Sequence, residues 1–258
     1  MSSLLDVQRL TRRFGGLTAV SGLDLTVEAG QIVGLIGPNG AGKTTVFNVI
    51  TGLLHPSEGE ILFAGRPVTG LPPHQITAQG IARTFQNIRL FGGADALQNI
   101  VMGMHARLTA GVCGGIFRPA SVRKEEADAV GRARELLAFV GLEEYADAAA
   151  TELPYGQQRR LEIARALAAA PQLLCLDEPA AGMNESESRD LMALIQRIRD
   201  RGVTVLLIEH DMHVVMNLCD RVVVLNFGQK IAEGTPAEIR VHRDVIEAYL
   251  GSEDRAAD

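Results

Sequence analysis

The sequence of 258 residues carries a formal net charge of −6, with 47% hydrophobic and 22% charged residues. A chain of this length can form one large or two modest domains with a buried core, and the composition is that of an ordinary soluble globular protein. The acidic balance argues against a nucleic-acid-binding protein, which usually has a basic excess or at least a basic stripe.

The cysteines and the hydropathy indicate the redox state of the compartment in which the protein works and its relation to a membrane. Cys113, Cys175 and Cys219 lack the paired spacing of a zinc or iron–sulfur site, which suggests reduced thiols in a reducing compartment. The N-terminal residues do not resemble a signal peptide, and no apolar run approaches the roughly 18 residues that span a bilayer. Any work at a membrane is therefore expected to be peripheral and to depend on a partner.

The first part of the chain predicts short strands. Residues 4–10 and 23–27 alternate apolar and polar side chains, as half-buried strands do. Residues 12–17 between them predict a turn that exposes the aromatic Phe14. The apolar residues 31–36 predict a buried strand, which leads directly into a glycine-rich segment.

That segment is Gly37-Pro38-Asn39-Gly40-Ala41-Gly42-Lys43-Thr44, which fits the phosphate-binding pattern G-x-x-x-x-G-K-[ST]. Residues 45–50 can continue as a helix, so the required strand, loop and helix are all present. The glycines allow a tight turn that directs backbone N–H groups at an anion, and the helix N-terminus adds its positive dipole end. Lys43 is expected to contact the β- and γ-phosphates and Thr44 to bind Mg²⁺. Residues 37–44 together with Thr45 therefore predict a nucleoside triphosphate site.

The region from about residue 87 to 152 has a different character. It is rich in Ala, Glu and Arg, and Val130, Ala133, Leu137 and Val140 lie at helical spacing within residues 122–140. Residues 111–119 predict a flexible break. We interpret the region as a mostly helical insertion into an α/β core.

The α/β pattern resumes after this insertion. Strands are predicted at residues 173–176, 203–208 and 222–225, and helices at 185–201 and from about 212. Thr235 to Glu238 resembles a capping box that opens a short final helix. Strands that alternate with helices favour a largely parallel sheet.

Two acidic residues end the strand at residues 173–176. Asp177 would leave the strand end beside the phosphate loop, where its carboxylate can hold Mg²⁺ directly or through water. Glu178 points elsewhere and can polarise an attacking water as a general base. The acids favour hydrolysis of the bound triphosphate.

A third signal lies in residues 153–167, before the acidic strand, where the chain resembles the ATP-binding cassette (ABC) family. The family signature Leu-Ser-Gly-Gly-Gln is matched at Leu153, Gly156 and Gln157. Gln86 matches the family's Q-loop glutamine and His210 its switch histidine. Phe14 falls where the family places an aromatic residue that stacks on adenine. The resemblance covers essentially the whole chain, in the family's order.

This resemblance implies a P-loop NTPase (RecA-like) core with N-terminal antiparallel strands and an inserted helical subdomain. The ATP-binding core would comprise residues 1–86 and 159–234, the helical subdomain 87–158, and the C-terminal helix and tail 235–258. Two cassettes would pair head to tail, with each ATP between the phosphate loop of one and the signature of the other. Gln86 would sense Mg²⁺ and the γ-phosphate, and His210 would orient the water with Glu178.

The chain departs from the family pattern in two places. The signature serine is replaced by Pro154, which has no donor, and the next glycine by Tyr155. Contacts to ATP across the dimer would then rest on Gly156, Gln157 and backbone N–H groups. Asn184 stands where the family usually has an aspartate, and it can still make interface hydrogen bonds. Arg159 and Arg160 are interpreted as a solvated or interface face of the signature helix.

The strings around residues 13–17, 155–162, 177–184 and 208–212 resemble the longer ATPase subunit of branched-chain amino-acid importers, the LivG type. This implies a peripheral protein on the cytoplasmic face of the inner membrane. Its partners would be a second ATPase subunit, identical or a sister, two membrane permease subunits and, indirectly, a periplasmic binding protein, with no nucleic acid. The alternatives are an importer ATPase for urea, amides or other amino acids, a soluble non-transport ABC ATPase, and a regulatory module with little hydrolysis.

Overall fold

The computed structural model describes residues 3–104 and 120–253, so the expected break at residues 111–119 and Cys113 lie outside the described residues. By residue contacts the chain divides into two compact units. We call residues 1–83 with 172–258 the core unit and residues 84–171 the helical unit. The functional domain bounds expected from the sequence stay a prediction.

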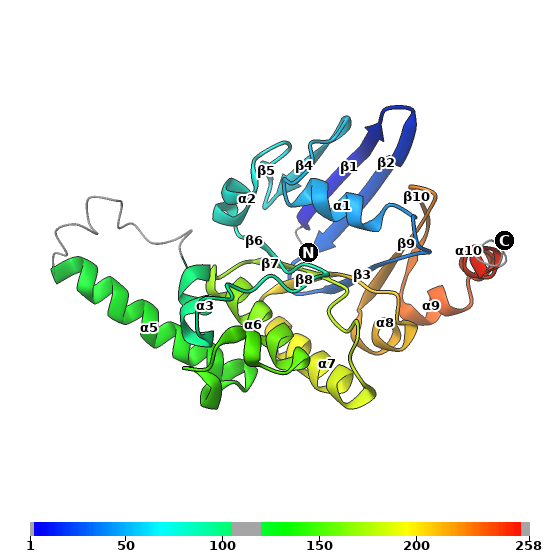
Figure 1. Cartoon of the computed structure of the whole chain (residues 1–258). Helices are drawn as coiled ribbons and strands as arrows, with labels where there is room; N and C mark the ends of the chain where they lie inside the picture. The colour runs from blue at the N-terminus through cyan, green and yellow to red at the C-terminus, as the bar shows by residue number, and fades with distance from the viewer. Residues whose placement is uncertain (1–2, 105–119, 254–258) are drawn as a thin grey trace. The chain divides into compact units, whose positions relative to one another are not determined.

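The core unit contains two sheets, which are labelled in Figure 1. The four-stranded sheet is antiparallel, in the order β2 (Leu17–Glu28), β1 (Ser3–Phe14), β4 (Glu58–Phe63), β5 (Arg66–Pro67). The six-stranded sheet has the order β10 (Gln229–Gly234), β9 (Arg221–Asn226), β3 (Ile32–Ile36), β8 (Thr204–Ile208), β7 (Leu173–Asp177), β6 (Ile81–Arg83). Every neighbouring pair is parallel except β10 with β9. The predicted α/β fold with N-terminal antiparallel strands is confirmed.

The first two strands are longer than the alternation of their residues indicates. Phe14 pairs with Leu17, so the turn expected at residues 12–17 is reduced to Gly15 and Gly16. Register shifts interrupt the β1–β2 pairing, and Arg9 has a left-handed φ of 47°. A β-bulge of this kind breaks the period of two, so the strand runs on where its sequence pattern stops.

Six helices of the core unit connect or flank these strands. They are α1 (Lys43–Ile50), α2 (Pro73–Gln79), α7 (Glu185–Asp200), α8 (Met212–Leu218), α9 (Pro236–Arg240) and α10 (Arg243–Glu253). The predicted capping box before α9 is confirmed, since Thr235 N donates to Glu238 Oε2 at 2.7 Å and Glu238 N to Thr235 Oγ1 at 3.4 Å.

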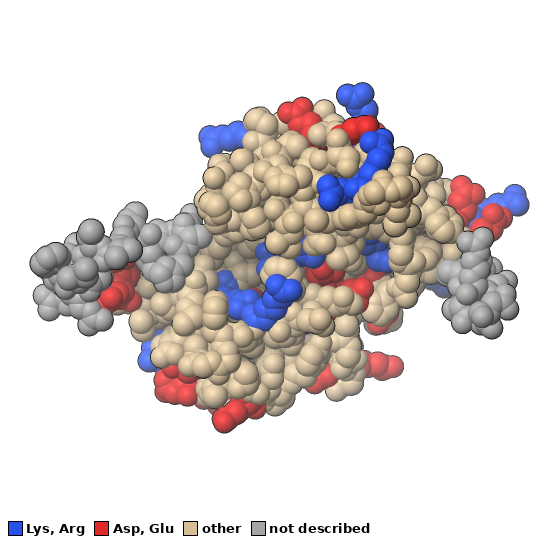
Figure 2. Space-filling model, turned by 45° about the horizontal axis from the view of Figure 1, so that its top comes forward, with Lys and Arg blue, Asp and Glu red and all other residues tan. Residues whose placement is uncertain are grey.

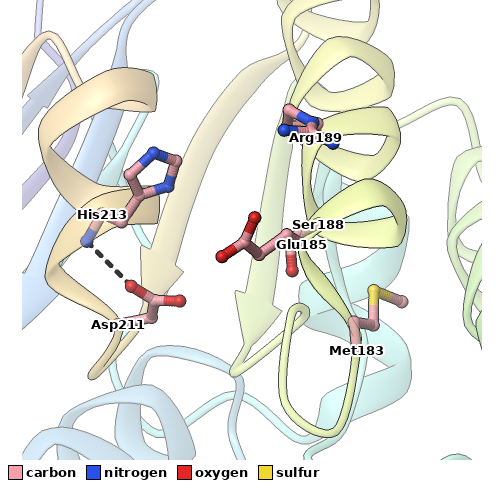
Figure 3. Close-up of a pocket in the computed structure, with 6 residues that line it drawn as sticks. All are labelled: Met183, Glu185, Ser188, Arg189, Asp211 and His213. Carbon is pink, nitrogen blue, oxygen red and sulfur yellow. Dashed lines mark hydrogen bonds between the residues drawn. The ribbon is translucent and has the colours of Figure 1, made fainter.

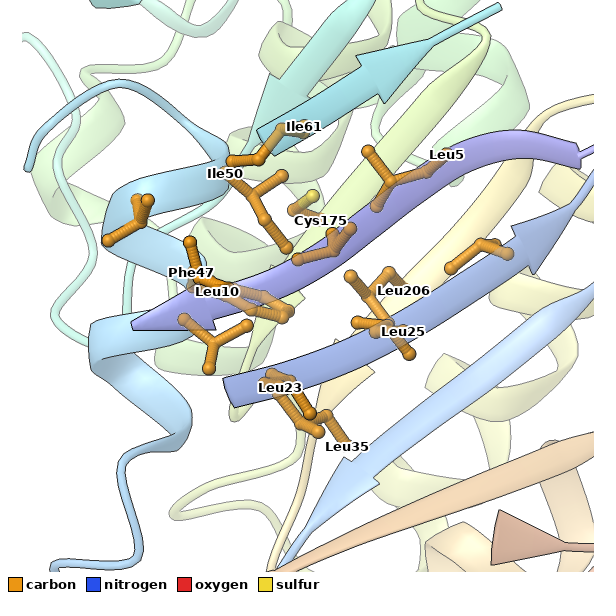
Figure 4. Packing of buried hydrophobic residues seen from close by; sticks show 14 of the residues in the cluster. Leu5, Leu10, Leu23, Leu25, Leu35, Phe47, Ile50, Ile61, Cys175 and Leu206 are labelled. Carbon is orange, nitrogen blue, oxygen red and sulfur yellow. The ribbon is translucent and has the colours of Figure 1, made fainter. Parts of the chain in front are cut away.

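One hydrophobic cluster fixes α1 against both sheets of the core unit. Phe47 and Ile50 of α1 are fully buried among Leu10 of β1 and Leu35 of β3 (Figure 4). Burying such side chains contributes roughly 1.5–3 kcal/mol each. Cys175, in the same cluster, is the small buried hydrophobe that its place in the strand predicts, and burial raises the pKa of its thiol to about 12. The loop between β3 and α1 is therefore attached at both ends to rigid structure.

The helical unit contains α3 (Ala96–Gly103), α5 (Ala120–Val140) and α6 (Tyr155–Ala168), with short 3₁₀ turns at Glu143–Tyr145 and Ala150–Glu152. The predicted long helix is confirmed, and Ala133, Leu137 and Val140 are buried along it. Val130 is instead 37% exposed and Ala129 is buried, because the i, i+4 stripe passes through Ala129.

The charged surface agrees with the acidic composition. On the face seen in Figure 2, the Lys and Arg side chains of the described residues form separate groups with Asp and Glu between them, rather than one continuous stripe.

Candidate functional site

The phosphate-binding loop lies between the buried strand β3 and helix α1. Gly37, Gly40 and Gly42 all have positive φ, and Gly42 is the N-cap of α1. A Cβ on Gly37 would lie 2.1 Å from the Leu225 carbonyl oxygen, and one on Gly42 would lie 2.5 Å from that of Ala19. The two glycines are therefore required by space as well as by backbone conformation.

Lys43 is enclosed by this loop. Its Nζ donates to the carbonyl oxygens of Gly37 at 2.7 Å and Pro38 at 2.8 Å, and the residue is 7% exposed. Burial lowers the pKa of Lys43, while the nearby carboxylates of Glu178 and Asp177 raise it in part. The amine is thus a partly desolvated cation at the centre of the loop, as phosphate binding requires. Of the other predicted contacts, Asn39, Gly40 and Thr44 are exposed and Thr45 is half-buried.

Asp177 ends β7 as predicted and is almost fully buried. Its Oδ2 accepts a hydrogen bond from Arg83 Nη2 at 2.6 Å, and both side chains are at most 6% exposed. Arg83 ends the neighbouring strand β6 and also donates to Asn48 Oδ1 and Thr51 Oγ1, on and just after α1. Sequence reasoning missed Arg83; its one signal is a basic residue at the end of a strand that pairs with the acidic one.

Glu178 and His210 meet within the core unit. His210 Nδ1 lies 3.6 Å from Glu178 Oε2, with the side chains 57% and 18% exposed. Glu178 has a left-handed φ of 46°, a conformation that costs a non-glycine residue about 1–3 kcal/mol and is common at functional sites. This left-handed conformation bends the chain directly after Asp177. A carboxylate and an imidazole so placed can share one water molecule.

Glu209 is a second residue that sequence reasoning missed. It is fully buried, and its carboxylate accepts from Ala180 N at 2.9 Å and from His210 N at 3.2 Å. Burial raises the pKa of Glu209, and these backbone donors lower it in part. The side chain ties the turn after Glu178 to the segment that carries His210. The one indication of Glu209 in the sequence is an acidic residue directly before the switch histidine, His210.

A hollow of about 340 Å³ lies beside this segment (Figure 3). It is lined by Met183 in the loop before α7 and by Glu185, Ser188 and Arg189 of α7. Asp211, the N-cap of α8, and His213 in its first turn line the other side. Asp211 caps α8 by accepting from His213 N at 2.8 Å. This bond gives Asp211 a helix-capping role.

Asn184 caps α7 in the same way. Its Oδ1 accepts from Glu187 N at 3.0 Å, and Glu187 Oε2 accepts from Asn184 N at 3.0 Å. Asn and Asp fill such a cap about equally well, so the departure from the family's aspartate leaves the helix start intact. Its interface role stays a prediction.

Phe14 lies at the tip of the β1–β2 hairpin. Its ring is 42% exposed, and the guanidinium carbon of Arg12 lies 4.6 Å from the ring centroid. In the same hairpin, β2 passes close to the phosphate loop, because the Ala19 carbonyl oxygen blocks any side chain at Gly42. An exposed aromatic on a strand pair that packs against the loop can stack on a base.

In the helical unit, α6 begins at Tyr155, with Pro154 as an N-cap that makes no side-chain hydrogen bond. Gly156 and Gln157 lie in its first turn and are half-buried. Gln157 N already donates to the Pro154 carbonyl oxygen at 2.9 Å, so the N–H groups of Tyr155 and Gly156, which precede it, are the ones that an anion can bind without a serine cap.

The interpretation of Arg159 as a solvated or interface residue was wrong. Arg159 is fully buried within the helical unit and forms an ion pair with Glu162 at 2.8 Å. Arg159 Nη2 donates to the Gln86 carbonyl oxygen at 2.7 Å, while the Gln86 residue itself is exposed. Arg160, the next residue, is half-buried. A 3.6-residue period turns neighbours about 100° apart, so adjacent arginines do not share one environment.

Residues 20–181 match the family model described as "ABC transporter", and residues 229–255 match "Branched-chain amino acid ATP-binding cassette transporter". The chain is 50% identical over 249 residues to the "High-affinity branched-chain amino acid transport ATP-binding protein BraF" of Pseudomonas aeruginosa, covering 96% of this chain and 98% of BraF.

Solved structures agree with this likeness. The ADP conformation of MJ1267, an ATP-binding cassette of an ABC transporter, has a TM-score of 0.86 at 32% identity and covers 97% of this chain and all of its own. The dimeric cassette MJ0796 bound to ADP and phosphate has a TM-score of 0.75 at 25% identity over 90% of this chain and 98% of its own. In the part of the chain that the structure describes, no helix has the length and apolar character to cross a bilayer. This chain belongs to the ABC transporter family, as one of its nucleotide-binding ATPases.

Proposed function

We propose that this chain is the ATPase subunit of an importer for branched-chain amino acids and hydrolyses MgATP within a dimer. The observation that carries the proposal is the 3.6 Å approach of His210 to Glu178, in the same unit as a phosphate loop that encloses Lys43. The printed description of BraF supplies the cargo class.

The core unit would bind the nucleotide. Lys43 and the backbone N–H groups of residues 37–44 would contact the phosphates, with Thr45 at the first helical turn and Phe14 against the base. Thr44 and Asp177 would hold Mg²⁺, with Gln86 as a further ligand. One carboxylate and one hydroxyl fit Mg²⁺, which usually takes one or two protein ligands together with phosphate oxygens. When bound, the ion neutralises phosphate charge.

Hydrolysis would then depend on residues of the same unit. Glu178 would accept a proton from the attacking water, and His210 would hold that water and the γ-phosphate in line. The left-handed backbone at Glu178 separates its carboxylate from that of Asp177, so that neighbouring acids can take different roles. Glu209 would fix the distance between the segments that carry Glu178 and His210.

The second half of the site would come from another subunit. The N-terminus of α6, with Gly156 and Gln157, would contact the γ-phosphate bound to the partner, and backbone N–H groups would replace the missing serine. The dimeric form of MJ0796 supports pairing of this kind. Whether the partner is a second copy or a sister ATPase is left to the test.

A transporter also needs a path through the membrane. We propose that two permease subunits supply it and that a periplasmic binding protein delivers the amino acid to them. The chain would then act at the cytoplasmic face of the inner membrane as a peripheral subunit. The printed description of BraF as a transport ATP-binding protein supports this arrangement.

The hydrolytic role is tested with Glu178→Gln in the purified full chain. ATPase turnover is expected to fall about 10²- to 10⁴-fold, the usual contribution of a general base, while ATP-dependent dimerisation persists. Turnover is measured by phosphate release and dimerisation by light scattering. Glu60→Gln is the matched control, since Glu60 is an exposed residue on β4. Brisk hydrolysis by the Glu178 variant would exclude this residue as the base.

The cargo is tested in vesicles that contain the chain with its co-purifying permease. ATP-dependent accumulation of labelled leucine, isoleucine or valine is expected, and labelled urea is expected to stay outside. Uptake of urea alone would instead favour the amide-importer alternative. If no permease co-purifies and no solute accumulates, the transport role fails and a soluble ABC ATPase remains.

A further inference from the structure

The signature helix α6 buries a charged pair that the proposed catalytic cycle does not use. The side chains of Arg159 and Glu162 are 0% and 1% exposed and lie 2.8 Å apart. Burying an ion pair is costly, and apolar residues of similar volume often serve stability equally well or better. The pair therefore calls for a role other than stability.

Its remaining hydrogen bonds all reach toward one short segment of the helical unit or the start of α6. Arg159 Nη1 donates to the Phe85 carbonyl oxygen at 2.6 Å, and Nη2 donates to that of Gln86 at 2.7 Å. Glu162 Oε1 accepts from Phe85 N at 3.4 Å and from Arg89 N at 3.2 Å. The pair thus binds the carbonyl oxygens of Phe85 and Gln86 and the N–H groups of Phe85 and Arg89.

The same guanidinium reaches the beginning of α6. Arg159 Nη2 lies 3.3 Å from the Tyr155 hydroxyl, and Tyr155 is the first residue of the helix. Gly156 and Gln157 follow it in the first turn. A single buried cation therefore links the backbone that carries Gln86 to the turn that carries the signature residues.

We propose that Arg159 and Glu162 are positioning residues that fix the backbone at Gln86 to the first turns of α6. The Gln86 side chain and the signature turn then move together. A change at Gln86 on binding of Mg²⁺ and the γ-phosphate is thereby passed to the signature that serves the other ATP site. This inference rests on the proposed function, because it concerns how one ATP site controls the other.

The geometry specifies arginine at this position. A guanidinium presents several N–H donors in a rigid fork, whereas a lysine ammonium is a point charge on a flexible stem. Lysine at 159 could still neutralise Glu162, but it could not hold two successive carbonyl oxygens in the same geometry. Arg159→Lys therefore keeps the charge and removes the fixed link.

The test measures ATPase kinetics of the purified full chain with Arg159→Lys. We expect kcat to fall about tenfold, since misplacing a catalytic group by 1 Å can cost up to about 10²-fold. The Kd for a fluorescent ATP analogue should stay within about twofold, because Lys43 and the loop of residues 37–44, which are proposed to hold the nucleotide of the same subunit, lie in the core unit. The matched control is Arg132→Lys on α5, where the residue is exposed. A wild-type kcat in Arg159→Lys would overturn the proposal.

A double-mutant cycle with Gln86→Ala separates positioning from plain stability. If Arg159 acts through Gln86, removing that side chain should cost much less in the Arg159→Lys background than in the wild type. Additive losses would mean that Arg159 acts on something else, and the proposal would fail. Should Arg159→Lys not fold, the apolar pair Arg159→Met with Glu162→Met is expected to fold and to show the same loss of kcat.

Amide hydrogen exchange gives a readout that does not need hydrolysis. Arg159→Lys should speed exchange at Phe85 and Arg89, whose N–H groups bond to Glu162, and leave exchange in α6 unchanged. Unchanged exchange at residues 85–89 would overturn the link even if the wild type is an active ATPase. A wild type that binds but never hydrolyses ATP would instead overturn the proposed function.

Discussion

Among the described residues, the core unit and the helical unit each bury an arginine–carboxylate pair, and the two pairs have different roles. Arg83 in the core unit ties Asp177 at the end of β7 to Asn48 and Thr51. Arg159 in the helical unit, paired with Glu162, binds loop backbone instead of another functional side chain. The first pair positions a metal-ligand candidate directly, whereas the second positions a peptide segment.

The phosphate loop and the signature turn also differ in how closely their own unit encloses them. The phosphate loop is enclosed by its own unit, with no space for a side chain at Gly37 or Gly42. The signature turn presents Gly156 and Gln157 at a helix N-terminus whose cap makes no side-chain bond. A loop that its own unit encloses leaves little room for a change of side chain, whereas a helix end that is proposed to meet a partner leaves more. Substitutions in the phosphate loop should therefore have larger effects on ATP binding and stability than substitutions in the signature turn.

The largest effect is expected for Gly37→Ala. Its Cβ would lie 2.1 Å from the Leu225 carbonyl oxygen at a backbone φ of 146°, so β9 or the loop must move. We expect loss of ATP binding by at least about 10²-fold, or loss of the folded protein, because a backbone clash cannot be relieved by rotating a side chain. Equilibrium binding of a fluorescent ATP analogue and thermal unfolding measure both outcomes. Gly30→Ala is the control, since Gly30 has a φ of 79° but open space around it. Comparable losses in both variants would refute the clash.

Arg83→Met should be the next most severe. It leaves the Asp177 carboxylate buried without its partner, and breaking a buried pair costs about 3–5 kcal/mol. Urea unfolding measures the lost stability, and the Mg²⁺ concentration for half-maximal ATPase activity should change as well. Arg13→Met is the control, because the pair Arg13–Glu58 is exposed and such pairs contribute about 0–1 kcal/mol. Equal losses in the two variants would show that Asp177 does not depend on Arg83.

Glu209→Gln should change how stability depends on pH. Burial raises the folded-state pKa of Glu209 above its ordinary value of 4.5, so the folded state binds the proton more tightly than the unfolded state. The contribution of Glu209 to stability therefore falls as the pH rises from 4.5 through the folded-state pKa. In the Gln variant this component should be absent, and urea unfolding across that range should give a flatter profile. An unaltered slope would mean that another group carries the pH dependence.

How much of the site the sequence predicts depends on how local the determining contacts are. The phosphate loop, Asp177 and Glu178 follow from short patterns at strand ends, and the family resemblance added His210. Arg83, Arg159 and Glu209 were missed or misinterpreted because their partners lie 94, 73 and 29 residues away in sequence. The sequence alone does not distinguish a buried charged residue from a solvated one when its partner lies far away along the chain.

How local the determining contacts are also explains which strands the sequence predicts. The strands at residues 32–36, 173–177 and 204–208 are buried in a parallel sheet and consist of apolar residues and glycine except for Asp177 and Thr204, and they were predicted within about one residue. In β1 and β2 a bulge breaks the alternation, and the short strand β6 forms only through its parallel pairing with β7. Strands specified by their own composition are predictable, whereas strands specified by a neighbour are not.

The smallest effect is expected for Pro154→Ser, which restores the family's residue to the signature. Serine at this N-cap can accept from a backbone N–H and stabilise α6 by about 0.5–2 kcal/mol. Losing proline offsets part of this gain, because the unfolded chain regains about 0.4–1 kcal/mol of conformational freedom. The expected net change in unfolding free energy is below about 1 kcal/mol.

The ATPase rate of Pro154→Ser should stay within about twofold of wild type, if backbone N–H groups of α6 carry the contact to the γ-phosphate. Phosphate release at saturating ATP measures it, with Gly156→Ala as the variant that should do more, since Gly156 lies in the first turn of α6. A tenfold faster Pro154→Ser enzyme would mean that a side-chain donor was missing. Pro154 would then lower the ATPase rate, and the signature turn would not tolerate this substitution without a loss of activity.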